Sequence, residues 1–400
     1  MLRWLMRLAK TEALPIRISH PGIRPDLIHP HARSVVHRLH QSGYAAYIVG
    51  GAVRDLLLGL APKDFDVATS AHPNEVRRLF RSALIIGRRF RLVHVRFGNN
   101  RIVEVATFRR HHGQETGEDP VRNDNVFGTE KEDAFRRDFT MNALFYDPES
   151  DLIIDYTGGL QDLKMRLIRC IGKPGERLAE DPVRMLRAIK FSARFNLSIE
   201  RKLAKSISGM SDHIRLCSQR RLFEELLKIM RGGILSPFVS KANDLHFLDT
   251  YLPFLQTLRT RHPALFDKLL TACDIACGEE GLEPAFGFAL LLWPNLKPCL
   301  SKTRDPQNAI RDTIIEFSKS FAITKNDKIF IRTLLVVKQR LDYYLTLPSK
   351  RRKFVARRLR NLPELPEALY FYRLIDEMEG NGIKNYEYWV RLLKERSEPI

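Results

Sequence analysis

Two aspartates stand two residues apart in the segment KDFDV, residues 63–67. Alternate side chains of an extended strand lie on opposite faces, so Asp64 and Asp66 share one face and Phe65 occupies the other. Neighbouring carboxylates repel each other, and bound Mg²⁺ removes that cost. Phosphoryl-transfer enzymes use such pairs to hold two metal ions about 4 Å apart. The pair therefore indicates a two-metal centre with Asp64 and Asp66 as ligands, and a solvated strand edge is the alternative.

Two further carboxylates are candidates for a third acid beside the metals. Glu104 lies in RIVEVATF, residues 101–108, where it interrupts a face otherwise formed by Ile102 and Ala106. Asp138 lies in FRRDFTMNALFYD, residues 135–147, where it could hold an arginine or help to organise the metal site. The alternatives are a solvent-facing edge strand for Glu104 and a helix cap for Asp138.

Triphosphate-binding candidates come from two segments. In IVGGAVRDLLLG, residues 48–59, a β-rich run ends at Gly50 and Gly51 and a helix begins, so backbone N–H groups could cradle phosphate while Arg54 adds charge. A structural tight turn is the commoner role of two glycines. In the 135–147 segment, planar guanidinium groups suit phosphate oxygens. The nucleotide-binding candidates there are Arg136, Arg137 and Asn142.

A base-reading candidate lies in EDPVRMLRAIKFSARF, residues 180–195. A helix is expected to begin near Asp181, which places Arg184 on a neighbouring surface position three residues later. A carboxylate can accept from the exocyclic amine of adenine while a guanidinium donates to a ring nitrogen. An ordinary surface salt bridge is the alternative, and the basic flank of this helix adds Arg187, Lys190 and Arg194.

A basic segment near the C-terminus, SKRRKFVARRLR at residues 349–360, follows Tyr343 and Tyr344. Dense positive charge beside aromatic rings is typical of grooves for single-stranded RNA, and a solvated helix face is the alternative. The RNA-binding candidates are Lys350, Arg351, Arg352, Lys353, Arg357 and Arg358.

The elements that must position these residues fall into two parts. From about Tyr44 to Cys170 short β-rich runs alternate with helical stretches, whereas helical patterns dominate after Gly175. Residues 111–132 read as a long loop. The predicted strands contain YAAYIVG, KDFDVAT, RLVHVRF, RIVEVATF and LIIDY, and the predicted helices include VRDLLLG, PNEVRRLF, RRLFEELLKIMRGG and NDKIFIRTLLVVKQRL. We therefore predict an α+β fold with a mixed head and an all-helical remainder.

Composition restricts the partners. The 66 Lys and Arg residues exceed the 47 Asp and Glu residues, and the net charge of +19 favours a nucleic acid, with a membrane surface as the alternative. The longest apolar run, from Ala285 to Trp293, is far shorter than the roughly 20 residues that span a bilayer, so we expect a core helix and no membrane span. Five scattered cysteines fit a reducing cytoplasm. We expect a cytoplasmic monomer.

The ordered motifs GGAVRD, DFD, RRDFTMNAL and EDPVRMLRA closely resemble those of the bacterial class II nucleotidyltransferases, the poly(A) polymerases and CCA-adding enzymes. The resemblance implies a polymerase-β-type head, followed by helical neck, body and tail. It implies an N-terminal extension at 1–42, the head at 43–172, a neck with the base-selecting helix at 173–240, and an RNA-binding body and tail at 241–400.

The same resemblance implies roles for individual residues. Asp64 and Asp66 would bind two Mg²⁺ ions, and the third acid is carried most naturally onto Asp138, with Glu104 as the second candidate. Gly51 and Arg54 would contact the triphosphate of ATP. Asp181 with Arg184 would select the base.

The product of the reaction depends on a weaker feature. The stretch IIGRRFRLVHV, residues 85–95, looks like one that marks poly(A) polymerases, which favours template-independent addition of AMP from ATP to RNA 3′ ends. CCA addition to tRNA and a noncatalytic RNA-binding protein are the alternatives. RNA 3′ ends and ATP are the expected partners, with RNA-decay proteins as further candidates.

Overall fold

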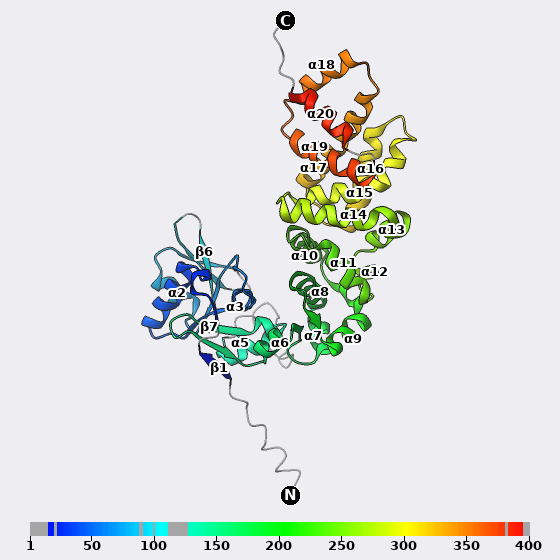
Figure 1. The fold of residues 1–400 in the computed structure, drawn as a ribbon. Helices are drawn as coiled ribbons and strands as arrows, with labels where there is room; N and C mark the ends of the chain where they lie inside the picture. The colour runs from blue at the N-terminus through cyan, green and yellow to red at the C-terminus, as the bar shows by residue number, and fades with distance from the viewer. Residues whose placement is uncertain are drawn as a thin grey trace. The chain divides into compact units, whose positions relative to one another are not determined.

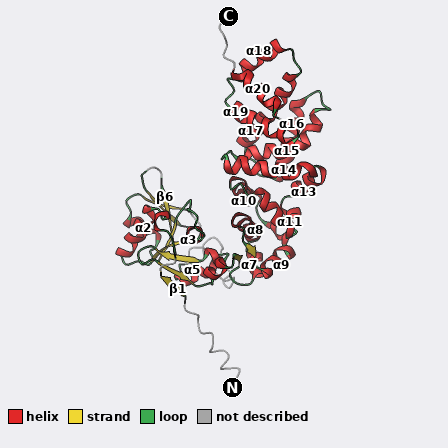
Figure 2. Cartoon of the chain, in the orientation of Figure 1, coloured by secondary structure: helices red, strands yellow, loops and turns green. Residues whose placement is uncertain are grey.

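The chain forms two units, seen here in a computed structural model that describes residues 15–19, 22–87, 91–98, 101–110, 127–380 and 383–394. The first unit comprises Met1–Glu180 with Leu197–Ala204, and the second comprises Asp181–Asn196 with Lys205–Ile400. The first contains the sheet and the second is built from helices (Figures 1 and 2). The predicted fold class, a mixed head followed by helices, is confirmed. The finer division of the helical part into neck, body and tail stays a prediction.

The head is built on an eight-stranded sheet in the order β1–β8–β7–β2–β3–β6–β5–β4. Neighbouring strands are antiparallel except β3 and β6, which are parallel. A parallel pair, β9 (Leu167–Ile168) and β10 (Ser198–Ile199), forms a second small sheet. The strands of the large sheet are β1 (Ile16–Ser19), β2 (Ala46–Val49), β3 (Asp66–Thr69), β4 (Ala83–Ile86), β5 (Leu92–Arg96), β6 (Ile102–Thr107), β7 (Leu144–Asp147) and β8 (Leu152–Asp155).

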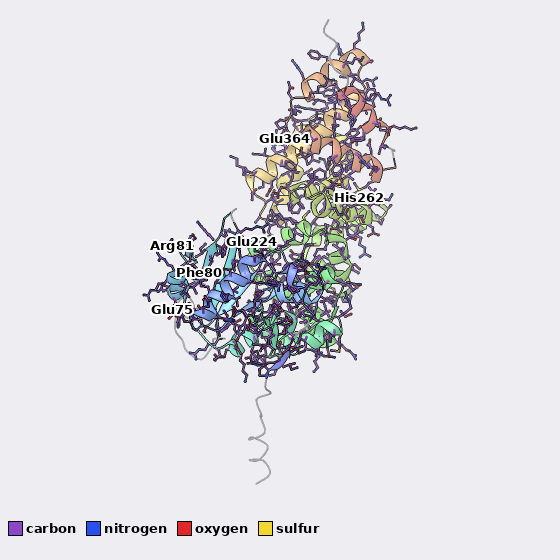
Figure 3. The ribbon with its side chains drawn as sticks, turned by 60° about the vertical axis from the view of Figure 1, so that its left-hand side comes forward. Glu75, Phe80, Arg81, Glu224, His262 and Glu364 are labelled. Atoms are coloured by element: carbon purple, nitrogen blue, oxygen red, sulfur yellow. The ribbon has the colours of Figure 1, made fainter. Side chains whose placement is uncertain are left out.

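Helices α2 (Pro30–Gln41) and α4 (Pro73–Leu79) contact each other and pack on the sheet. The buried positions of α2 are spaced at three and four residues, as expected of a helix with one apolar face. Phe80, which follows α4, is buried, and the guanidinium of Arg38 on α2 lies 5.2 Å from the centre of its ring (Figure 3). Because β1 and α2 lie within residues 1–42, the predicted N-terminal extension supplies part of the head.

The remaining head helices are short and lie between strands or after the sheet. Residues 111–126 of the predicted long loop lie outside the described residues. The helices are η1 (Pro25–Leu27), α3 (Gly51–Leu57), α5 (Glu130–Arg136), η2 (Thr140–Asn142), α6 (Gly159–Lys164) and α7 (Pro174–Glu180).

Helix α15 (Pro284–Leu300) forms the centre of the second unit. It packs against α10, α14, α16, α17 and α19, and the apolar run from Ala285 to Trp293 is buried as predicted. None of the described helices has the length and apolar character that crossing a membrane requires. The other helices are α8 (Val183–Phe195), α9 (Arg201–Gly209), η3 (Ser211–Leu216), α10 (Gln219–Arg231), α11 (Leu235–Asp244), α12 (Leu248–Tyr251), α13 (Pro253–Arg261), α14 (Pro263–Asp274), η4 (Ile275–Glu279), α16 (Pro306–Ser320), α17 (Lys325–Leu345), α18 (Ser349–Leu359), α19 (Leu365–Met378) and α20 (Lys384–Lys394).

Candidate active site

The glycine turn and the aspartate pair meet at one edge of the head sheet. Val49, the last residue of β2, pairs with Asp66, the first residue of the antiparallel strand β3, and Gly50 follows directly. Gly50 has a φ of 69°, which favours glycine, and a Cβ there would lie 3.1 Å from Nη1 of Arg137. The turn after β2 therefore follows the residue paired with Asp66 and lies beside the guanidinium of Arg137.

Three carboxylates lie along this edge. Asp66 pairs with Glu104 in the parallel register of β3 and β6, and Asp64 precedes Asp66 by two residues. Phe65 and Val67 are buried whereas all three acids are exposed, as the predicted alternation requires, but β3 begins only at Asp66, so Asp64 and Phe65 precede the strand on which they were expected. Desolvation by the surrounding protein, together with the charges of Glu104 and Asp64, raises the pKa of Asp66 to about 6, although Arg137 opposes the shift.

The donor chemistry of these acids suits Mg²⁺. Carboxylate oxygens are the hard ligands that Mg²⁺ prefers. Desolvation is the main cause of the raised pKa of Asp66, and the repulsion from Glu104 and Asp64 that adds to it is what a divalent cation relieves. The side chains of Asp64, Asp66 and Glu104 are open to solvent, so an ion has access to them. The sequence did not identify His94 on β5, whose Nε2 lies 3.3 Å from Oε1 of Glu104.

Replacing Asp66 with asparagine is expected to stabilise the metal-free protein at neutral pH. The folded state raises the pKa from the usual 3.8 to about 6, so it holds this proton more tightly than the unfolded chain does. The free energy of unfolding therefore falls as pH rises between these two values. Because the side chain is open to solvent, we expect a gain of about 1 kcal/mol, less than the full shift implies.

Thermal unfolding in EDTA measures this effect. The Tm values of the wild type and Asp66→Asn should nearly coincide at pH 4 and should separate, with the variant higher, at pH 7.5. A difference that is the same at both pH values would contradict the charge repulsion inferred at Asp66.

Arg54 is buried, and its partners are inside the head. Its Nη2 donates to Oδ1 of Asp55 over 2.7 Å, and its Nη1 donates to Oδ1 of Asn142 over 2.7 Å. A guanidinium held by two buried partners joins the glycine turn to the segment that carries Asn142. The structure thus brings together three of the predicted nucleotide-binding residues, Gly51, Arg54 and Asn142, and adds Asp55, which the sequence reading missed.

Asp133 on α5 is a second buried acid that the sequence reading missed. It contacts both Arg136, at 2.6 Å from Oδ1 to Nη2, and Arg137, at 2.9 Å from Oδ2 to Nη2. Burial alone would raise the pKa of Asp133, but the charges of Arg137 and Arg136 hold it below its usual value. The spacing of three and four residues was a visible signal for these pairs. Asp133 positions the arginine that lies beside Gly50.

Asp138 has a different environment from Glu104. Its side chain is buried, and Oδ1 accepts hydrogen bonds from the backbone N–H of Phe139, over 2.9 Å, and from Nδ2 of Asn142, over 3.3 Å. Glu104 is aligned with Asp66 in the sheet and is exposed. Of the two candidates for the third acid, Glu104 is the one that is exposed and aligned with Asp66 in the sheet.

In the second unit, Asp181 precedes α8, which begins at Val183, two residues later than expected. Both oxygens of its carboxylate lie 3.0 Å from Nη2 of Arg221 on α10. The backbone N–H of Val183 also donates to Oδ1 over 3.3 Å, so Oδ2, which accepts only from Arg221 among these donors, keeps a lone pair for another donor. No local pattern indicated this pair, because forty residues separate its members.

The basic flank of α8 is smaller than predicted. Lys190 forms a salt bridge with Glu225 on α10, and both side chains are largely buried. The prediction that Lys190 belongs to the basic flank is therefore wrong. Its side chain is largely buried and paired with a carboxylate, so it is not available to bind phosphate. Arg184 and Arg187 are partly exposed on the same helix.

Helix α18 carries the predicted RNA-binding residues. Lys350, Arg351, Lys353 and Arg358 are exposed. Arg352 is partly buried, where its Nε donates to the carbonyl oxygen of Leu347 over 2.8 Å. The side chain of Arg357 lies outside the described residues. Two large aromatic side chains, Tyr343 and Phe354, are more than half exposed near these cations, which agrees with the predicted combination of charge and stacking surface.

Comparisons with known proteins identify the family of this chain. Residues 46–169 match the family model of the poly A polymerase head domain, and residues 196–258 match that of the probable RNA and SrmB-binding site of polymerase A. Poly(A) polymerase I of Salmonella typhimurium is 36% identical over 389 residues, which cover 91% of this chain and 82% of the relative. The chain belongs to the family of poly(A) polymerases and CCA-adding enzymes. It is a nucleotidyltransferase of this family.

Other members of the nucleotidyltransferase family match to different extents. Poly(A) polymerase I of Escherichia coli O6:H1 is 38% identical, and the match covers 78% of this chain and 68% of the relative. The CCA-adding enzyme of Lactobacillus helveticus is 38% identical but covers 55% of this chain and 53% of its own. The solved CCA-adding enzyme of Bacillus stearothermophilus in complex with CTP has a TM-score of 0.68 and 24% identity, covering 91% of this chain and 82% of its own, which shows a shared fold.

Proposed function

We propose that the protein adds AMP from ATP to RNA 3′ ends without a template. The extent of the similarity carries this proposal. At comparable identity, the poly(A) polymerases match 78–91% of the chain, which includes much of the helical unit, whereas the CCA-adding enzyme matches 55%. The net charge of +19 and the exposed cations of α18 suit an enzyme that holds many different RNAs through their phosphates.

The reaction forms a bond between the RNA 3′-oxygen and the α-phosphorus of ATP and breaks the bond to pyrophosphate. Asp64, Asp66 and Glu104 would hold two Mg²⁺ ions, which when bound favour the deprotonated 3′-hydroxyl and neutralise charge on the triphosphate. The N–H groups at Gly50 and Gly51, with Arg137, bind the triphosphate. Arg54 fixes the glycine turn through its buried partners.

Glu104 is our choice for the third acid. It is exposed and aligned with Asp66, and its charge contributes to the raised pKa of Asp66. Asp138 instead accepts two hydrogen bonds at one oxygen and is buried. We therefore assign Asp138 to positioning Asn142 within the segment that binds Arg54.

Asp181 and Arg184 are proposed to read the adenine base, with Arg221 holding the carboxylate in place. Arg184→Ala is then expected to lower the ratio of kcat/KM for ATP to that for CTP by about ten- to a hundredfold, the value of a paired contact to one base. Turnover at saturating ATP should change less. Single-nucleotide incorporation with each triphosphate measures the ratio.

Arg194→Ala is the matched control for this prediction, because Arg194 is an exposed arginine on the same helix. It should leave the ratio of ATP to CTP use near that of the wild type. If Arg184→Ala behaves like Arg194→Ala, base reading belongs to other residues.

The proposed function is tested by offering the purified protein an unstructured RNA and a tRNA lacking its 3′ end, each with ATP or CTP alone. We expect long ATP-dependent extension of both RNAs on a denaturing gel. Short extension that requires CTP and occurs on the tRNA alone would establish CCA addition, and no extension of either RNA would favour a noncatalytic RNA-binding protein.

A further inference from the structure

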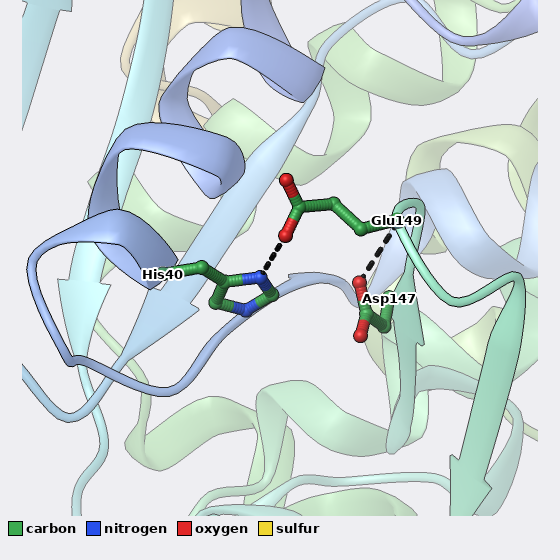
Figure 4. Close-up of side chains that lie close together, drawn as sticks. All are labelled: His40, Asp147 and Glu149. Carbon is green, nitrogen blue, oxygen red and sulfur yellow. Dashed lines mark hydrogen bonds and ion pairs between the residues drawn. The ribbon is translucent and has the colours of Figure 1, made fainter.

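A second group of metal-ligating side chains lies in the head, where α2 meets the turn between β7 and β8. His40 is near the C-terminal end of α2, Asp147 ends β7, and Glu149 lies in the turn (Figure 4). One potential ligand atom from each of the three residues lies within 4.8 Å of the others. Its mixture of imidazole and carboxylate differs from the all-carboxylate group at Asp64, Asp66 and Glu104.

His40 is held in the orientation of a metal ligand. Its Nε2 lies 2.8 Å from the carbonyl oxygen of Ala46, and it therefore donates its proton there. In the neutral ring this leaves the lone pair of Nδ1 directed at Oε2 of Glu149, only 2.5 Å away. Two electron-rich atoms this close share a proton, and a metal ion bound to both would replace that proton as the atoms move apart. An N–H donated to a backbone carbonyl is the usual outer support of a metal-binding histidine.

The carboxylates are also held in place by their surroundings. Oδ1 of Asp147 accepts from the backbone N–H of Glu149 over 2.9 Å, and Oδ2 accepts from Oγ of Ser150 over 2.6 Å. Each oxygen keeps a second lone pair for another partner.

His37 supplies an additional nitrogen. It stands three residues before His40 on the same helix, and its Nδ1 contacts Oε1 of Glu149. Glu149 therefore lies between two imidazoles from α2. Their side chains are partly open to solvent, with exposed fractions of 57% for His37, 22% for His40 and 37% for Glu149, so small rotations are possible.

We propose that His40, Asp147 and Glu149, with His37 as an additional ligand, bind a divalent transition-metal ion of the Zn²⁺ type. Imidazole nitrogen favours such an ion over Mg²⁺, which prefers oxygen ligands. Ligand atoms of a tetrahedral zinc site lie about 3.4 Å apart. The ligand atoms of His40, Asp147 and Glu149, which lie up to 4.8 Å apart, would reach this spacing by rotation of their side chains. The ion would fasten α2 to the β7–β8 turn and plays no part in nucleotide transfer.

Binding of Zn²⁺ to the full chain tests this proposal. The protein is stripped with EDTA, dialysed and titrated calorimetrically with ZnCl₂ in excess Mg²⁺, which occupies oxygen-only sites. We expect one Zn²⁺ per chain that Mg²⁺ does not displace. His40→Gln and Glu149→Gln should each weaken its binding at least about tenfold. His31→Gln, which removes another imidazole of α2, should bind like the wild type.

Substitution with Co²⁺ gives a second readout that does not depend on a variant folding well. Bound Co²⁺ in the wild type should show the intense visible absorption of a tetrahedral site with nitrogen ligands. Equal Zn²⁺ affinity in the wild type, His40→Gln and Glu149→Gln, displacement of Zn²⁺ by Mg²⁺, or Co²⁺ absorption typical of the aqueous ion would each overturn the proposal. In those cases the histidines and Glu149 form hydrogen-bonded ion pairs and not a metal site.

Discussion

Asp64→Ala is expected to lower the rate of AMP addition at least about a thousandfold at saturating ATP and Mg²⁺. A bound metal contributes several kcal/mol to stabilising the transition state, and each 1.36 kcal/mol corresponds to a tenfold change in rate. The Tm should stay within a few degrees of the wild type, because Asp64 is exposed and precedes β3 rather than packing in the core. Extension of a labelled RNA, followed over time, measures the loss.

Asp26→Ala is a suitable control, since Asp26 is an exposed aspartate of the same unit that lies in η1 and pairs with Arg24. It should retain nearly full activity. If Asp64→Ala kept a tenth or more of the wild-type rate, Asp64 would not be a ligand of the catalytic metals.

Glu104→Gln and Asp138→Asn should affect the protein in different ways. We expect Glu104→Gln to lower turnover about a hundredfold, because it removes a charge beside Asp66 that would neutralise and hold the metals. Asp138→Asn should lower turnover less than tenfold and should reduce the free energy of unfolding by about 1 kcal/mol, since it alters a buried hydrogen-bond group. Rates and urea unfolding measured side by side separate the two effects.

The reverse pattern would move the third acid back to Asp138. It would consist of an inactive Asp138→Asn with unchanged stability, together with an active Glu104→Gln. That outcome would also mean that alignment with Asp66 in the sheet does not select the metal ligands of this head.

Local patterns were sufficient to predict the strands that carry the acids. KDFDVAT and RIVEVATF became β3 and β6, and the alternation placed Phe65 in the core and Asp66 at the surface. The sequence reading missed β7, because its first three residues, from Leu144 to Tyr146, are all buried and show no alternation. It also missed β1, which pairs with β8 far along the chain.

Contacts between residues that are far apart in the sequence could not be predicted from local patterns. Asp66 meets Glu104 only because β3 and β6 pair in parallel, and Asp181 meets Arg221 only because α8 packs on α10. Arg54 was predicted from its place after the glycine turn, but its burial with Asp55 and Asn142 depends on how the 135–147 segment folds. The sequence does contain a signal for Asp133, because Asp133 stands three and four residues before two arginines.

The stretch from Ile85 to Val95, which favoured poly(A) synthesis, contains the end of β4 and most of β5, two strands that pair antiparallel. Residues 88–90 within it lie outside the described residues. Its bearing on the product stays a prediction. The proposal of poly(A) synthesis over CCA addition therefore rests on how much of the chain each class of relative matches. Identifying the reaction product tests it.

The nucleotides added to one RNA test the central claim most directly. The protein is incubated with a tRNA that lacks its 3′ CCA, in the presence of Mg²⁺ and all four nucleoside triphosphates, and the extended 3′ ends are sequenced. A template-independent AMP-adding enzyme should produce runs of adenosine that lengthen with time. Ends that stop at CCA would contradict the account.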